Sequence, residues 1–226
     1  RIGVNPYKFG FIGSTDTHNG TPGHVSTENF MGHVGVVDAT PEGRLGAGTV
    51  THDTLENNPG GLAAVWATEN SRDAVFEALR RRETFATSGP RIALRFFGAE
   101  SLPADLCDKD GRISTARSLG VPMGGSIESG ASFFLEAQAD KTPLSHIEII
   151  KGWIDADGRT HQEVIPLSTP TEASVDTSTC AREGDGSASL CTVWTDPAPV
   201  ENGFYYARVI EVPTCRWSQR ECINFP

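Results

Sequence analysis

The strongest constraint on the fold comes from the second part of the chain, where short strand-like runs follow one another from about residue 92 onward. The runs are rich in β-branched and aromatic residues and are separated by Gly, Pro, Asp and Ser. Their sequences are RIALRFFG, ASFFLEAQA, HIEIIKGWI, HQEVIPL, SLCTVWTD and FYYARVIEV. Such spacing, with no convincing helix between the runs, predicts an antiparallel β-sandwich. Asp157-Gly158, between two of the runs, predicts a hairpin turn.

The first part of the chain has a different pattern, in which strand-like runs accompany a helix. The apolar run FGFIGS at residues 9–14 predicts a buried strand, and GGLAAVWA at 60–67 predicts another. ETFATSGPR reads as a further strand that stops at Gly89-Pro90. SRDAVFEALRRR, at 71–82, predicts a helix, because apolar residues share one face and the charges suit its two ends.

Residues 20–60 have little periodicity and are rich in Gly, Thr and Asn, so we expect a long loop with a short helix near Glu28–Met31. A length of 226 residues allows one domain or two small ones. We therefore predict an α/β portion at residues 1–91 and an all-β sandwich domain at residues 92–226.

Charge and hydropathy restrict the partners. The formal net charge is −10, and an acidic surface repels phosphate backbones and anionic lipid headgroups. No apolar run approaches the roughly 20 residues that span a bilayer. We therefore expect neither nucleic acid nor membrane as a partner, whereas a small-molecule substrate stays possible. The sequence opens on Arg1 within what reads as folded protein, so we expect a segment upstream.

Five cysteines indicate the compartment. Cys180 and Cys191 flank a Gly/Ser-rich turn, and Cys215 and Cys222 flank a short segment at the end of the chain. We predict a disulfide within each pair, which leaves Cys107 unpaired. A zinc site is the alternative, but no CxxC pair occurs and no histidine lies near these cysteines. Disulfides favour a periplasmic or extracellular location.

One short motif carries chemistry, Asp16-Thr17-His18, which follows the first predicted strand. In an extended segment Asp16 and His18 project to the same side and can share a divalent ion such as Zn, Mn or Fe. The alternative is that Asp16 shapes an Asx-turn and His18 is a surface residue. Two ligands do not complete a catalytic metal site. Further candidates lie in the adjoining loops, although each alone is better explained as a solvated or packed side chain: His24, His33 and His52.

Four longer motifs carry a family resemblance that runs from about Gly3 to Ser218. They are FGFIGSTDTHNGTPG, NPGGLAAVWATENSRDAVFEALRRRETFATSGPRI, GVPMGGSI and FYYARVIEVPTCRWS. The chain resembles the bacterial domain-of-unknown-function 3604 (DUF3604) family. That family looks related to the polymerase-and-histidinol-phosphatase (PHP) superfamily of metallohydrolases, which resemble a distorted (β/α) barrel with divalent ions at the ends of its strands.

The resemblance implies roles for particular residues. The last metal motif of the superfamily has the form Asp-x-His, so Asp16 and His18 would bind metal and help to activate water. Apart from the resemblance, Thr15, Asn19 and Arg91 are candidate contacts to the substrate or to these ligands. Arg91 could clamp an anionic substrate with two guanidinium nitrogens, or could equally be an arginine that starts a surface-facing strand. The earlier motifs of the superfamily are absent and would lie upstream of Arg1.

Two hypotheses about function follow. In the first, the chain holds the last strands of the barrel and a β-rich domain of a metal-dependent hydrolase that acts on phosphoester or other ester-like bonds. This hydrolase is incomplete without its N-terminal half. In the second, the chain is a non-catalytic, secreted β-sandwich module for binding or structure.

Overall fold

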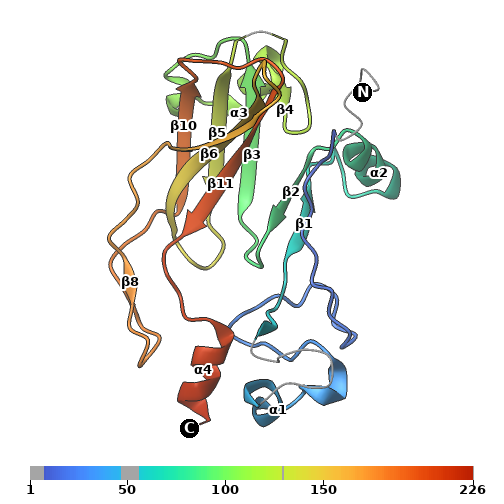
Figure 1. Ribbon diagram of the computed structural model, residues 1–226, viewed down its shortest axis with the longest axis vertical. Helices are drawn as coiled ribbons and strands as arrows, with labels where there is room; N and C mark the ends of the chain where they lie inside the picture. Colours follow the sequence, from blue (N-terminus) through green and yellow to red (C-terminus); the bar gives the residue numbers. More distant parts are fainter. Residues whose placement is uncertain (1–7, 47–55, 129, 226) are drawn as a thin grey trace.

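The computed structural model describes residues 8–46, 56–128 and 130–225 (Figure 1). Its strands are β1 (Leu62–Val65), β2 (Thr84–Thr87), β3 (Ala93–Ala99), β4 (Val121–Pro122), β5 (Ser132–Gln138), β6 (Leu144–Ile154), β7 (Thr160–Pro166), β8 (Ser174–Val175), β9 (Arg182–Glu183), β10 (Ser189–Thr195) and β11 (Gly203–Glu211). Its helices are α1 (Pro41–Leu45), α2 (Arg72–Arg80), α3 (Arg112–Leu119) and α4 (Trp217–Asn224), with 3-10 turns η1 (Gly35–Val37) and η3 (Leu106–Asp108).

Two antiparallel sheets form the predicted sandwich. One has the strand order β10-β5-β3-β4 and the other β11-β6-β7. The main core lies between them and includes Phe133 and Leu135 of β5 and Ile147 and Ile149 of β6. The six strand-like runs of the sequence correspond to the six long strands of the two sheets. The turn between β6 and β7 is the predicted hairpin, and Gly158 has the left-handed φ of +80° that such a turn requires.

A helical layer that the sequence pattern did not predict covers the outer face of the first sheet. Phe97 and Phe134 point away from the sandwich core and pack with Leu106 of η3 and Ala116 of α3. The continuous apolar run of β5 needs this cover, because a strand buried on both faces requires a layer on each side. The expectation that no helix interrupts the strands is therefore wrong. Helix α3 has few apolar residues, so its sequence carries only a weak helix signal.

The α/β portion keeps its helix and two of its three strands. β1 and β2 form an antiparallel pair, and Ser71 caps α2 by accepting a hydrogen bond from the Ala74 backbone. This pair packs on the sandwich core through Trp66 and Phe85. No barrel closes in the part of the chain that is described, and the antiparallel pair does not show the parallel strands of a barrel remnant.

The predicted strand at residues 9–14 is wrong. These residues form no strand, and Phe9, Phe11 and Ile12 expose 70%, 57% and 64% of their surface. At the end of the segment the Gly13 backbone donates to the carbonyl of Leu62 (3.2 Å). An apolar run becomes a buried strand only where other layers cover it, and contacts such as that between the rings of Phe11 and Tyr206 leave most of these side chains exposed.

The long loop is largely irregular where it is described, but its helix lies elsewhere than expected. Residues near Glu28–Met31 form only a turn, whereas α1 begins at Pro41. Thr40 caps α1 through its hydroxyl, and Pro41 stands at a first-turn position where its missing N–H costs nothing. At the other end of the chain, α4 returns to this loop, since Trp217 contacts Phe30.

Both disulfides differ from the predicted pairs. Cys107 of η3 is bonded to Cys191 of β10, and Cys180 is bonded to Cys215. Cys222 is free and exposed. Cys191 faces the helical layer, so its partner lies there. Helix α4 separates Cys215 from Cys222, because a rise of about 1.5 Å per residue carries the latter beyond the roughly 7 Å that a disulfide spans.

The two disulfides nonetheless fit an oxidising, extracytoplasmic compartment. The first joins the helical layer to the sandwich, and the second joins the segment after β8 to the start of α4. Among the described residues, no helix combines the length and the apolar character needed to cross a membrane.

A buried ion pair closes one end of the sandwich core. The Lys151 ammonium lies 2.7 Å from Asp196, and both side chains are at most 5% exposed. Tyr205 donates a further hydrogen bond of 2.7 Å to the same carboxylate. Burial alone would raise the pKa of Asp196, but the hydrogen bonds from Lys151, the Ala198 backbone and Tyr205 together lower that pKa below its ordinary value.

Candidate metal centre

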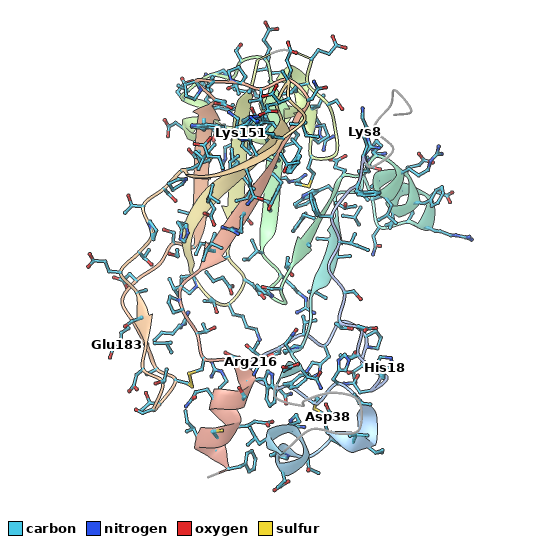
Figure 2. The ribbon with its side chains drawn as sticks, in the orientation of Figure 1. Lys8, His18, Asp38, Lys151, Glu183 and Arg216 are labelled. Carbon is cyan, nitrogen blue, oxygen red and sulfur yellow. A yellow bond between two sulfur atoms is a disulfide. The ribbon has the colours of Figure 1, made fainter. Side chains whose placement is uncertain are left out.

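The Asp-Thr-His motif lies on a tight turn at the end of the molecule that also holds α1 and α4, opposite the buried Lys151 (Figures 1 and 2). Asp16 has a left-handed backbone with φ of +51°. A residue other than glycine rarely adopts this region, and such outliers gather at functional sites. The hydroxyl of Thr15 accepts a hydrogen bond of 3.3 Å from the Thr17 backbone and so closes the turn around Asp16.

Backbone-to-backbone packing holds this turn in place. The Gly61 backbone donates to the carbonyl of Ser14 (2.8 Å). A Cβ atom on Gly60 would stand 2.4 Å from the Cα atom of Thr15, and one on Gly61 would stand 2.4 Å from the carbonyl oxygen of Thr87. Only glycine permits such close approach. The Gly60-Gly61 pair before β1 therefore packs directly against the backbone of Thr15, the residue before Asp16.

His18 is exposed, and a second histidine lies beside it. The rings of His18 and His33 are 5.5 Å apart between centroids and meet at an angle of 67°. The His18 backbone donates to the carbonyl of His33 (2.7 Å). Asn19 donates to the carbonyl of Gly32 (2.7 Å), which ties the motif to the same segment. The predicted role of Asn19 as a contact to substrate stays a prediction, and its observed role is to join two loops.

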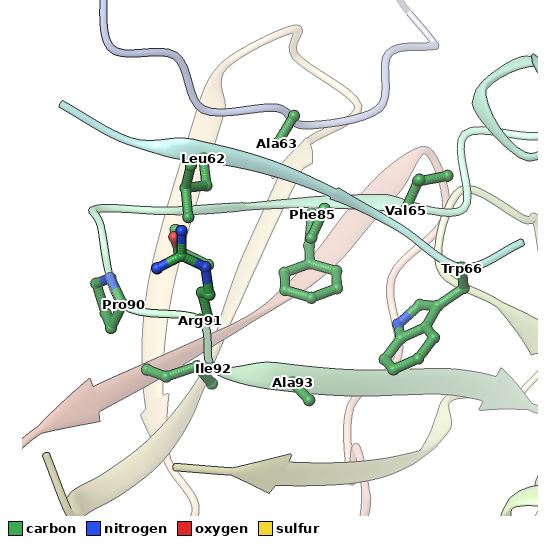
Figure 3. A pocket seen from close by; sticks show the side chains of 11 residues that line it. Leu62, Ala63, Val65, Trp66, Phe85, Pro90, Arg91, Ile92 and Ala93 are labelled. Carbon is green, nitrogen blue, oxygen red and sulfur yellow. The ribbon is translucent and has the colours of Figure 1, made fainter. Parts of the chain in front are cut away.

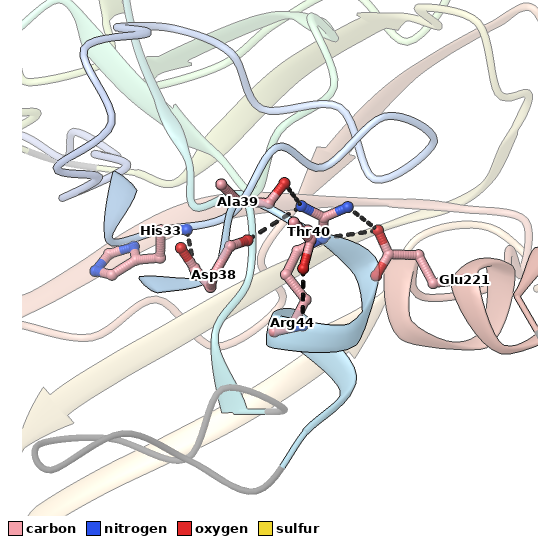
Figure 4. Close-up of polar contacts among 7 residues, drawn as sticks. His33, Asp38, Ala39, Thr40, Arg44 and Glu221 are labelled. Atoms are coloured by element: carbon pink, nitrogen blue, oxygen red, sulfur yellow. Dashed lines mark hydrogen bonds and ion pairs between the residues drawn. The ribbon is translucent and has the colours of Figure 1, made fainter. Parts of the chain in front are cut away.

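A buried carboxylate fixes the segment that carries His33 (Figure 4). Asp38 is 1% exposed, and its two oxygens accept hydrogen bonds from the backbones of His33 (2.6 Å) and Val34 (2.8 Å). Arg44 donates to the carbonyl of Asp38 (3.1 Å) and forms an ion pair of 2.5 Å with Glu221 of α4. Figure 4 shows the His33 ring pointing away from these contacts. The C-terminal helix therefore braces the loop beside the motif.

The donor set suits a divalent ion but does not complete a site. A carboxylate at Asp16 and imidazoles at His18 and His33 are the ligand types that Zn, Mn and Fe accept. Among the described residues, no group of three or more His, Cys, Asp or Glu side chains could hold a metal ion. His24 lies in the same loop, and its backbone donates to Thr21 (3.2 Å). His52, the remaining candidate, lies outside the described residues.

Arg91 lies at a cavity of about 370 Å³ between β1, β2 and the start of β3 (Figure 3). Apolar side chains line most of this cavity, among them Leu62, Phe85 and Ile92. Figure 3 shows the Arg91 side chain extending toward Leu62. The Arg91 backbone donates to the carboxylate of Asp140 (2.9 Å), and its guanidinium has a long contact of 3.5 Å with the carbonyl of Gly23. Its role as a clamp for an anionic substrate stays a prediction.

Sequence reasoning gave no role to two features of this region, Asp38 and the Gly60-Gly61 pair. A lone aspartate in a loop has no distinguishing signal. The Gly60-Gly61 pair does carry a signal in the sequence, because consecutive glycines before a strand indicate that another backbone segment comes close. His33 is one of the candidate loop histidines of the sequence, and the structure distinguishes it because its ring lies beside that of His18.

A family of sequences matches this chain over its whole length. The family described as "Protein of unknown function (DUF3604)" matches residues 1–226, and the match therefore includes both the motif and the sandwich. No curated protein and no solved structure matches the chain.

Proposed function

The chain belongs to the DUF3604 family, and we propose that it forms the C-terminal part of a metal-dependent hydrolase for phosphoester or other ester-like bonds. Asp16 and His18 are its metal ligands. Further ligands come from an N-terminal half upstream of Arg1, which builds the remainder of a PHP-like (β/α) barrel. The protein works in the periplasm or outside the cell, where its two disulfides are stable.

The observation that carries the proposal is the left-handed backbone of Asp16 within a turn that the protein holds from both sides. A strained conformation persists only where its surroundings impose it, and here the Thr15 hydroxyl and the Gly60-Gly61 surface do so. Nothing in the sandwich core requires Asp16 to adopt this conformation. A rigid, exposed turn that presents a carboxylate and an imidazole suits ligand binding.

The roles of the chain's own residues follow from their contacts. The Asp16 carboxylate supplies negative charge, and His18 supplies a neutral nitrogen ligand. Thr15 shapes the turn, and Asn19 fixes its distance from the neighbouring loop. A divalent ion bound there lowers the pKa of a coordinated water and so supplies a nucleophile near neutral pH.

The test uses the full-length gene product, purified with its metal. Asp16→Ala and His18→Ala should each remove bound metal and abolish hydrolysis on a panel of phosphoesters and carboxylesters. Asp157→Ala, on the distant exposed hairpin, is the matched control and should retain both. Stoichiometric metal in both motif variants would refute the assignment.

A second candidate function is supported by a different observation. The regular structure and both core clusters are concentrated in the sandwich, and a disulfide joins its helical layer to a sheet. A non-catalytic binding or structural module needs no more than this. The module would account for the protein if the full-length product took up no divalent metal and hydrolysed none of the esters.

A further inference from the structure

We propose that the cavity between β1, β2 and the start of β3 binds a small organic carboxylate, with Arg91 on its charge and apolar side chains around its body (Figure 3). The sequence suggests only that Arg91 could meet an anion. The structure adds a cavity of about 370 Å³, at the small end of the roughly 300–1,000 Å³ that ligand pockets occupy. The proposal does not depend on a metal ion at the Asp-Thr-His motif.

One face of the β1–β2 pair forms a wall of this cavity. Leu62 stands opposite Thr87 in the register of the pair. Two positions further along β1, Ala64 stands opposite Phe85, and residues two apart on a strand share a face. All four side chains therefore lie on the face that lines the cavity. Figure 3 shows the ring of Phe85 between β2 and the start of β3, where Ile92 lines the opposite wall. Phe85 and Ile92 are at most 9% exposed and belong to the main core, so the apolar part of the cavity is built on fixed side chains.

The residues around Arg91 fix the place from which its side chain extends. Gly89 has a φ of +135°, and a Cβ atom there would stand 2.9 Å from the carbonyl oxygen of Val25. Pro90 follows, and its ring holds its own φ at about −65°. The Arg91 backbone then donates to the carboxylate of Asp140 (2.9 Å). The main chain at this end of the cavity is therefore held in place.

The guanidinium of Arg91 is available to an anion. Among the described residues, no carboxylate forms an ion pair with it, and its contact with the carbonyl of Gly23 is long at 3.5 Å. A guanidinium presents pairs of N–H donors that match the two oxygens of a carboxylate. A monoanion is favoured over a phosphate, because the net charge of −10 repels each further negative charge. The hydroxyl of Thr87, which lines the same cavity, can add a hydrogen bond to the ligand.

The test compares two probes of the same shape, phenylbutyrate and its neutral amide, phenylbutanamide. Isothermal titration calorimetry measures the binding of each to the full-length protein after EDTA has removed bound metal and has itself been dialysed away. Coordination of the carboxylate to a metal then cannot contribute. The acid should bind at least about tenfold more tightly than the amide, because hydrogen bonds between charged groups are stronger than neutral ones.

Three variants locate the site, and circular dichroism with thermal unfolding establishes that each is folded. Arg91→Met keeps the stem of the side chain and removes its charge, so it should bind the acid as weakly as the amide. Ala64→Leu adds volume on the cavity face and should weaken both probes by about tenfold, the scale on which overpacking acts. Arg80→Met removes the same charge from α2, where the side chain is 66% exposed, and should bind both probes like the parent.

Loss of the preference for the acid in Arg91→Met, with the preference kept in Arg80→Met, supports the proposal. A parent protein that binds neither probe, or binds the acid no better than the amide, overturns it, as does an Arg91→Met variant that keeps the preference. A folded Ala64→Leu variant that binds like the parent would place the probes elsewhere and also overturn it. If Ala64→Leu does not fold, the comparison of Arg91→Met with Arg80→Met decides. The proposed hydrolase is unaffected by a failure here, because no part of the test measures metal or hydrolysis.

Discussion

Substitution of Gly60 by alanine should disturb the Asp16 turn. The Gly60 backbone has a φ of +77°, which costs a residue with a Cβ atom roughly 1–2 kcal/mol. The new Cβ atom would also lie 2.4 Å from the Cα atom of Thr15, whereas ordinary contact begins near 3.4 Å. Thr15 must therefore move by about 1 Å, since its backbone has no flexible end that can rotate away.

The magnitude follows from these two contributions. Overpacking of this kind costs about 1–3 kcal/mol beyond the backbone strain. Gly20 provides the control, because its φ is +73° and a Cβ atom added there would meet nothing within 4 Å. Gly20→Ala thus carries the strain without the displacement. The restriction that alanine places on the unfolded chain is the same in both variants and cancels in the comparison.

Urea denaturation of the chain measures the free energy of unfolding, and chelator competition on the full-length protein measures metal affinity. Gly60→Ala should unfold about 1–3 kcal/mol more easily than Gly20→Ala. It should also bind metal more weakly, because displacement of a positioned group by about 1 Å is costly at a functional site. Equal stability and equal metal affinity in the two variants would show that close packing on Gly60 does not position the motif.

Three further predictions concern the sandwich and the cysteines. Cys222 should be the single thiol that reacts in denaturant without reductant, and five reactive thiols would exclude both disulfides. Cys180→Ala should lower the free energy of unfolding by about 4 kcal/mol, because the disulfide that it removes closes a loop of 35 residues. Lys151→Met should cost about 3–5 kcal/mol at pH 7 by leaving the buried carboxylate of Asp196 unpaired. Lys151 helps to lower the pKa of Asp196 in the parent, whereas in the variant burial raises that pKa, so the cost should shrink as the pH of the urea titration falls and the unpaired carboxylate takes up a proton. A cost that stays constant with pH would contradict the charge argument. Burial and a nearby aspartate raise the pKa of Glu211 to about 7, so the stability of the protein should fall as pH rises from 4.5 through 7. Glu211→Gln should remove that fall. In thermal unfolding at pH 8 the variant should be more stable than the parent by roughly 1–2 kcal/mol.

The sandwich could be predicted from the sequence because its signals are local. Alternation of apolar and polar residues sets the face of each strand, and turn residues set its end. The same reasoning failed at β5, whose run from Phe133 to Ala137 is buried on both faces. That run was itself the signal for a covering layer, and it indicated α3 more strongly than the sequence of α3 did. The predicted disulfide pairs are wrong for a related reason. They rest on closeness in sequence, whereas strand direction and helix rise decide which cysteines are close in space.

The candidate site, too, could be predicted from the sequence only in part. Asp16 and His18 could be named because they stand two positions apart in one motif. His33, Asp38 and Gly60 could not be assigned, because their roles depend on which loops meet. Nothing in the sequence shows that the His18 and His33 rings lie side by side, or that two backbone N–H groups converge on the carboxylate of Asp38.

The brace on the His33 loop also bears on how the two portions of the chain depend on each other. Glu221, near the C-terminus, pairs with Arg44, whose guanidinium holds the carbonyl of Asp38, which in turn holds the His33 backbone. Each step is buried or nearly so, and a buried ion pair that loses one partner leaves a costly charge. The helix after the sandwich therefore cannot leave without loosening the loop beside the motif. A β-rich domain that only followed the α/β portion would not need this contact, so the last helix of the chain belongs structurally with the loop beside the Asp-Thr-His motif.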